Sequence, residues 1–175
     1  MIYFFLIIFA VLTRFVPHVS NAAAITAIAI FAAVYLPKKQ AIALPLAARL
    51  VTDAILGFFA WPQMIAVYAA HLIGVVFGLW IKKSEGKQRW VKIIASGFGA
   101  SLIFFAITNF AFLYPEPQYM HNWSGIVLSY TNGLPFLRGT LLGDMGYVAA
   151  LFGVYEFAQY LIRRKDAIRS LAHES

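Results

Sequence analysis

The sequence predicts an all-α membrane protein: a single bundle of six transmembrane helices with both chain ends in the cytoplasm. Three observations lead to this prediction. Hydrophobic residues make up 62% of the 175 residues and charged residues only 12%, whereas a soluble domain carries about 25% charged residues. The apolar residues fall into six segments. The basic residues gather in alternate connections between these segments. This composition excludes a soluble enzyme, a disordered chain and, because cysteine is absent, a disulfide scaffold.

The first three apolar segments are delimited by proline and charge. The first, residues 2–15, ends before Pro17 and lacks the basic start of a signal peptide, so we interpret it as a retained helix. The second, residues 22–36, is rich in alanine, which lets membrane helices approach closely. Its small side chains serve packing inside the chain or form a docking face for a partner. The third, residues 41–59, ends near Pro62, because the residue before a proline disfavours helix.

The last three segments, residues 63–81, 91–113 and 134–162, are longer. A spanning helix needs about 20 apolar residues, so these segments are long enough to cross a membrane, while the first two must tilt or borrow flanking residues. The sixth segment is long enough to project beyond the membrane. Between the fifth and sixth segments lies an unusually long loop, residues 114–133. Loops of this length are uncommon in compact proteins unless they are functional or disordered.

The distribution of Lys and Arg predicts the topology. Apart from Arg49 and Arg138 inside apolar segments, the outer connections contain Arg14 alone. The remaining basic residues lie between segments two and three, between segments four and five, and after segment six. They are Lys38, Lys39, Lys82, Lys83, Lys87, Arg89, Lys92, Arg163, Arg164, Lys165 and Arg169. Cytoplasmic loops carry such an excess, so we expect both termini in the cytoplasm and a location in the bacterial inner (plasma) membrane. The net charge of +7 then reflects topology and not binding to nucleic acid.

Ionisable residues inside the apolar segments are candidates for function, since a charge at membrane depth costs roughly 2.5–3.5 kcal/mol. Arg49 and Asp53 share a helix face, as a self-neutralising pair or as part of a pocket wall. Helix rise places Asp53 and Asp144 in the outer half of the membrane, where they could line one pocket. Asn109 serves an interhelical bond or the same pocket. We expect the isolated His71 to be a packing residue and not a metal ligand.

The long loop and the absence of catalytic motifs suggest binding without chemistry. The sequence contains no G-x-S-x-G, H-E-x-x-H, Walker A or G-x-G-x-x-G pattern, so we expect neither an enzyme nor a bound cofactor or metal. Aromatic side chains interleaved with amides suit a ring-shaped polar ligand, or equally an aromatic belt at the membrane surface. The residues concerned are Tyr119, His121, Asn122, Trp123, Tyr130 and Asn132.

Short stretches spread over most of the chain carry a family resemblance. They are Arg14-Phe15-Val16-Pro17-His18, Asn21, Pro45 to Asp53, Phe104 to Phe110, Gly133-Leu134-Pro135-Phe136 and Thr140 to Asp144. Together they resemble a bacterial family of small transport proteins that is similar to the substrate-binding S components of energy-coupling factor (ECF) vitamin transporters.

The resemblance implies a function. S components have six helices, keep both termini inside and bind a vitamin at the outer face, so it implies uptake of a vitamin-like or related micronutrient. It also suggests an ECF energising module as a partner, although the first helix lacks the A-x-x-x-A pattern through which S components dock. The implied substrate-binding residues are His18, Asp53, Trp61, Asn109, His121, Trp123, Tyr130, Asn132 and Asp144.

A non-transport membrane scaffold, similar to the rod-shape protein MreD, is the alternative. A scaffold would act through helix–helix contacts and would need no polar pocket. Convergence of Asp53, Asn109 and Asp144 on one cavity would favour transport. The expected partners are a small-molecule substrate and membrane lipid, without nucleic acid.

Overall fold

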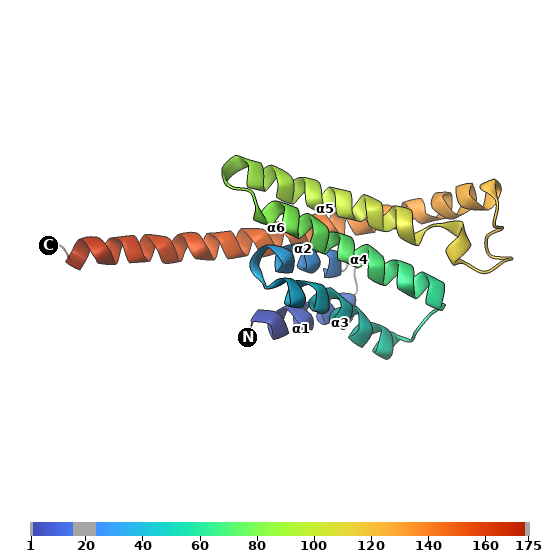
Figure 1. The fold of residues 1–175 in the computed structure, drawn as a ribbon, viewed down its shortest axis with the longest axis horizontal. Coiled ribbons are helices and arrows are strands. Elements are labelled where there is room, and N and C mark those ends of the chain that lie inside the picture. The colour runs from blue at the N-terminus through green and yellow to red at the C-terminus, as the bar shows by residue number, and fades with distance from the viewer. Residues whose placement is uncertain (1, 16–23, 174–175) are drawn as a thin grey trace.

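The computed structural model describes residues 2–15 and 24–173, and this part of the chain contains helices and no strands. The prediction of an all-α fold is therefore confirmed. Figure 1 shows the helices lying roughly along one axis, with the C-terminal part of α6 projecting alone from one end of the bundle. The elements are α1 (Ile2–Phe15), α2 (Ile25–Tyr35), α3 (Lys38–Leu56), α4 (Trp61–Lys82), α5 (Gly86–Thr108), the short 3₁₀ helix η1 (Ala111–Leu113) and α6 (Trp123–His173).

Helix α2 is the centre of the bundle. It contacts all five other α-helices, and its residues from Ile25 to Val34 are all buried. Alanines at this position keep the helix thin, so neighbouring backbones approach it from every side. Within its described residues the alanine-rich segment is therefore internal packing, and the alternative of a docking face is wrong there because Ile25 to Val34 are all covered.

The contact between α2 and α4 depends on two glycines one helical turn apart. A Cβ atom on Gly78 would collide with the carbonyl oxygen of Ile30 and with Ala33, and one on Gly74 would press on Ala29. This is the small-residue pattern that brings membrane helices into backbone contact. The register between α2 and α4 is thereby fixed.

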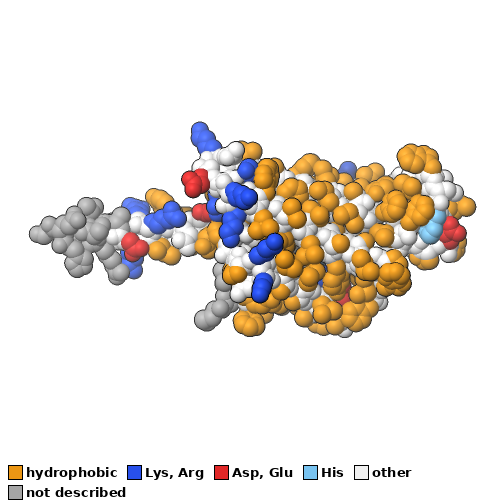
Figure 2. Space-filling model, in the orientation of Figure 1, with side chains coloured by type: hydrophobic (Ala, Val, Ile, Leu, Met, Phe, Trp, Pro, Cys, Tyr) orange, Lys and Arg blue, Asp and Glu red, His pale blue; other side chains and the backbone are white. Residues whose placement is uncertain are grey.

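Three helices are long and apolar enough to cross a membrane: α4, α5 and residues Trp123–Asp166 of α6. Large hydrophobic side chains such as Phe4, Val76 and Val154 lie exposed on the outside, and Figure 2 shows hydrophobic side chains covering most of the visible face of the bundle. A soluble monomer rarely exposes so much contiguous apolar surface. The chain is thus built as a helical membrane protein.

Helix α6 begins at Trp123, well before the predicted start at residue 134. The prediction of a loop over residues 114–133 is therefore wrong from Trp123 onward, where the chain is helical. The Asn122 side chain accepts a hydrogen bond of 3.0 Å from the backbone N–H of Gly125, which is the geometry of an N-terminal cap. Pro135 lies inside the helix. The apolar pattern missed this first part because Thr131, Asn132 and Gly133 lower its hydrophobicity without preventing helix formation.

The other predicted boundaries differ from the observed ones for a related reason. Helix α5 begins at Gly86, inside the predicted polar loop, and ends at Thr108, before the predicted end at residue 113. Helix α3 begins at Lys38 and ends at Leu56, where Gly57 follows with φ of 101°. Glycine adopts this conformation without strain, so it stops the helix. Hydrophobicity marks the apolar part of a helix, whereas capping and glycine decide where its backbone begins and ends.

Candidate functional site

Helices α1 and α3 meet at a buried carboxylate. Asp53 on α3 is 1% exposed. Its Oδ1 lies 3.0 Å from Nη1 of Arg14 on α1, and its Oδ2 lies 2.8 Å from Nε of Arg49, one turn earlier on α3. Arg14 also donates to the Thr52 hydroxyl at 2.7 Å. We call Arg14, Arg49, Thr52 and Asp53 the arginine–aspartate cluster.

The arginine–aspartate cluster holds two guanidinium groups and one carboxylate, so it retains one positive charge. The predicted Arg49–Asp53 pair is confirmed, but Asp53 does not balance Arg49 alone because Arg14 shares it. The two arginine side chains are 17% and 14% exposed, and the Arg49 guanidinium lies 5.4 Å from the centre of the Phe59 ring. An aromatic face offsets part of a cation's charge but does not neutralise it. Arg14 was not among the site residues predicted from the sequence, where it entered only the count of basic residues and the family resemblance.

Two further polar pairs lie inside the bundle. The Ser101 hydroxyl on α5 donates to Asp144 Oδ2 on α6 at 2.8 Å, and Asp144 is 2% exposed. The Thr26 hydroxyl lies 3.3 Å from His71 Nδ1. His71 also packs on the Phe104 ring. The interpretation of His71 as a bonded packing residue is confirmed, and both pairs link helices that are distant in sequence.

Helix α4 carries two buried polar atoms that have no hydrogen-bond partner among the described residues: the Tyr68 hydroxyl and His71 Nε2. Residues three apart lie on one helix face. A buried polar group without a partner is unfavourable by about 1–3 kcal/mol, so such groups are rare and need an explanation. Two on one face of a helix that borders the polar interior are suited to bonding a small molecule or water.

The connection between α5 and α6 is folded by its own polar groups. His121 donates from Nε2 to the carbonyl of Tyr114 at 2.9 Å, and its backbone N–H donates to Glu116 at 3.0 Å. Its ring stacks on Phe112 at 4.7 Å. Burial raises the pKa of the Tyr114 hydroxyl above its ordinary value, and the nearby Tyr119 adds to the rise.

The α5–α6 connection is anchored to both of its helices. The Tyr130 hydroxyl donates to the carbonyl of Ala106 at 2.6 Å, and the Asn132 amide donates to the Tyr119 hydroxyl at 3.4 Å. The Asn109 side chain lies so close to Gly133 that a Cβ there would collide with it. The Asn109 amide donates to the Phe105 carbonyl of its own helix at 2.9 Å, so Asn109 packs against α6 without forming the interhelical hydrogen bond that we expected. Tyr130 and Asn132 act from α6, not from a loop.

The predicted site residues separate by depth. His121, Asn109, Tyr130 and Asn132 lie at the end of the bundle formed by the α5–α6 connection. Gly133, which Asn109 touches, is about 16 Å along α6 from Asp144 by helix rise. No hydrogen bond among the described residues joins Asp144 to the arginine–aspartate cluster. Asn109 is thus separated from Asp144 along the bundle, while the convergence of Asp53, Asn109 and Asp144 on one cavity stays a prediction.

The remaining predicted residues lie at the surface or outside the described chain. Trp61 and Trp123 are 72% and 77% exposed at the first residues of α4 and α6. Exposed tryptophans at helix ends are typical of the membrane–water interface. His18 lies outside the described residues. Within the part of the chain that the structure describes, no three His, Asp or Glu side chains lie close enough to hold a metal ion.

The fold and these interior groups define a helical membrane protein with ionisable side chains inside its bundle. The sequence matches the family of unknown function DUF6580 over residues 1–166, so the chain belongs to that family. No curated protein and no solved structure matches it.

Proposed function

We propose that this protein is a membrane-embedded substrate-binding protein for the uptake of a vitamin-like or related micronutrient, captured from the outer face. The arginine–aspartate cluster is the observation that carries the proposal. Ionisable residues within apolar helices are unfavourable unless they are paired, and they are functional sites by default. A scaffold that acts only through helix contacts has no use for an uncompensated interior charge.

The interior charges favour a ligand that carries an acidic group. Arg14 and Arg49 together exceed Asp53 by one positive charge, and both arginines keep guanidinium N–H groups beyond those that bind Asp53 and Thr52. Guanidinium recognises carboxylate and phosphate through paired hydrogen bonds. The unpartnered Tyr68 hydroxyl and His71 Nε2 offer further hydrogen bonds nearby on α4.

The proposed topology is six crossings of the inner membrane with both termini in the cytoplasm. Figure 2 supports it, because Lys and Arg side chains gather at the end of the bundle from which α6 projects. In Figure 1 the first turn of α1 and the end of α6 lie toward this same end. The exposed lysines there belong to the starts of α3 and α5 and to the end of α4: Lys38, Lys39, Lys82, Lys83 and Lys87.

A thermal-shift screen of the purified protein against vitamins and their precursors tests the proposal. A ligand present at 100 times its Kd stabilises the folded state by about 2.7 kcal/mol, which is readily measured. We expect a hit with an acidic group, lost in Arg49→Gln and kept in Arg138→Gln, because Arg138 is exposed and forms no ion pair among the described residues. No hit, together with co-purification of cell-envelope membrane proteins, would instead support the scaffold alternative.

A further inference from the structure

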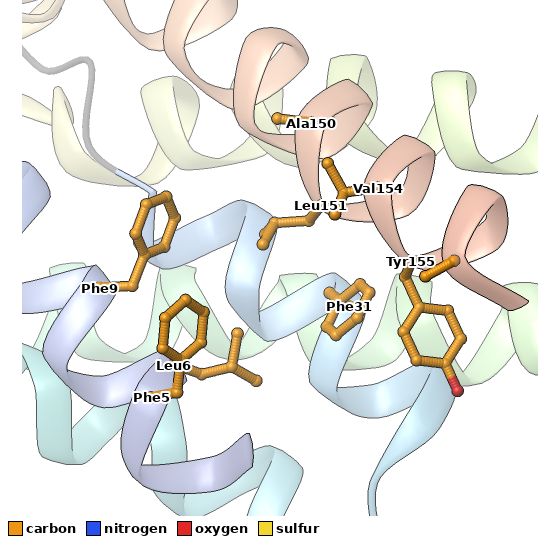
Figure 3. Close-up of a pocket in the computed structure, with 9 residues that line it drawn as sticks. Phe5, Leu6, Phe9, Phe31, Ala150, Leu151, Val154 and Tyr155 are labelled. Carbon is orange, nitrogen blue, oxygen red and sulfur yellow. The ribbon is translucent and has the colours of Figure 1, made fainter.

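An apolar groove and a polar cavity meet at Tyr155, on the side of the bundle formed by α2 and α6. The groove has a volume of about 360 Å³ and lies between α1, α2 and α6. Figure 3 shows the rings of Phe5, Phe9 and Phe31 and the side chains of Leu151 and Val154 around it. Its lining is apolar throughout, which suits a hydrocarbon chain.

The polar cavity continues from the groove along the next turns of α6. Its volume is about 390 Å³, and Tyr155 borders both spaces. Arg163, Gln159 and Glu156 of α6 line it, opposite Arg89 and Glu85 from the start of α5. The change from apolar to polar lining therefore takes place within about one turn of α6, where Tyr155 and Ala158 border the groove and Glu156 and Gln159 border the polar cavity.

The polar cavity has hydrogen-bonding capacity that the described residues leave unused. Arg89 Nη2 donates to the Tyr35 hydroxyl at 2.7 Å and to Glu156 at 3.0 Å. Arg89 Nε is buried and has no partner. Because Glu156 and Tyr35 satisfy only one edge of the guanidinium, its other N–H group is available to a phosphate oxygen.

The charges that remain in the polar cavity have opposite signs. Glu156 is paired with Arg89, so Arg163 and Glu85 are left as one cation and one anion. A purely anionic headgroup would meet repulsion from Glu85. A zwitterion with a phosphate and a primary ammonium matches both, the phosphate on Arg89 and Arg163 and the ammonium on Glu85.

The dimensions fit one leaflet of a bilayer. From Ala150 to Ala158 the groove follows α6 for about 12 Å, and half of the hydrocarbon core is about 15 Å thick. The polar cavity begins where that thickness ends, at the end of the bundle where Lys and Arg gather (Figure 2). The polar cavity therefore lies where a lipid headgroup would lie, and the groove lies where its acyl chain would lie.

We propose that this composite site binds an ethanolamine phospholipid, with an acyl chain in the groove and the phosphoethanolamine headgroup in the polar cavity. The proposal is independent of micronutrient uptake, because none of the residues in this site belongs to the arginine–aspartate cluster.

Native mass spectrometry with added phosphatidylethanolamine, phosphatidylcholine or phosphatidylglycerol tests this proposal on the full-length protein. Ala150→Trp fills the groove, and Ala149→Trp is its control, since both alanines are exposed and only Ala150 lines the groove. Arg163→Gln removes the phosphate partner, and Arg164→Gln is its control outside the cavity.

We expect phosphatidylethanolamine to be retained in preference to both other lipids. Retention should fall about tenfold in Arg163→Gln, the factor for one lost charged hydrogen bond. It should also fall in Ala150→Trp, because the indole occupies the space of the acyl chain, and it should be unchanged in both controls. Equal retention of the three lipids, or preference for phosphatidylglycerol, would overturn the headgroup assignment. Equal losses in the variants and their controls would overturn the site itself.

Discussion

At the scale of single residues, Asp53 is the group on which the interior charges depend. Both of its oxygens are occupied, each by a different arginine. A buried charge that loses its partner is strongly destabilising, because the desolvation cost remains while the attraction is lost. We therefore expect Asp53 to be important for stability, whereas the arginines are the groups that we propose bind a ligand.

Asp53→Asn should destabilise the protein by about 3 kcal/mol, since it leaves two guanidinium groups without a countercharge. Unfolding in mixed detergent micelles, followed by circular dichroism, measures the change. Arg138→Gln is the matched charge variant at an exposed position and should change stability little. If Asp53→Asn were as stable as the wild type, the cluster would not hold α1 to α3 as described.

Two buried serines on α5 should respond differently to the same substitution. Ser101 donates to Asp144, so Ser101→Ala should destabilise the fold by about 1–3 kcal/mol by leaving the carboxyl without its donor. Ser96 is equally buried but its hydroxyl has no partner among the described residues, so Ser96→Ala should be neutral or stabilising. The unfolding assay used for Asp53→Asn compares them, and equal effects would contradict the hydrogen bond to Asp144.

Sequence alone predicts pairings within a helix better than pairings between helices. Arg49 and Asp53 are one turn apart, so their contact follows from helix geometry. Arg14 and Ser101 reach their partners only because α1 packs on α3 and α5 on α6, which no local pattern encodes. One signal was available for Arg14: it is the only basic residue in the connections predicted to lie outside, and both interior carboxylates were expected in the outer half of the membrane.

At the scale of elements, α2 is the helix around which the others pack. The alanines of α2 predicted close packing with another helix. The structure shows that the two glycines of α4 provide this contact. The apolar content of each helix was predictable, whereas its ends were not. Asn122 caps α6 ahead of a stretch whose polar residues resemble a loop. A helix cap depends on a single side chain, so an average of hydrophobicity over many residues does not detect it.

Gly78→Ala should destabilise the bundle by about 1–3 kcal/mol, because the new methyl group meets the Ile30 backbone, which cannot move aside. Gly146→Ala is the control, since a Cβ there meets nothing. Alanine favours helix over glycine, so the control should be neutral or slightly stabilising. Thermal unfolding of the two variants checks this, and identical behaviour would rule out backbone contact between α2 and α4.

At the scale of the whole molecule, the proposed function depends on how the two ends of the bundle are oriented in the membrane. Basic side chains lie at one end of the bundle, and aromatic side chains with amides lie at the other. This arrangement suits the proposed protein, which captures a solute outside and has its basic end in the cytoplasm. The chain has no cysteine, so single cysteines can report on each side without background.

In intact cells, a membrane-impermeant maleimide should label Met120→Cys in the α5–α6 connection and should not label Lys83→Cys between α4 and α5. Both positions are exposed, so the difference reports on the membrane alone. After the cells are opened, both should react. Labelling of Lys83→Cys in intact cells would reverse the proposed orientation.

The most direct measurement for the central claim is the native mass spectrum of the protein as purified from cells, beside those of Arg49→Gln and Arg138→Gln. We expect a bound acidic small molecule on the wild type and on Arg138→Gln, and its loss from Arg49→Gln with the fold retained. Spectra that show only lipid on all three proteins, after supplementation of the growth medium with vitamins, would contradict a micronutrient site at the arginine–aspartate cluster.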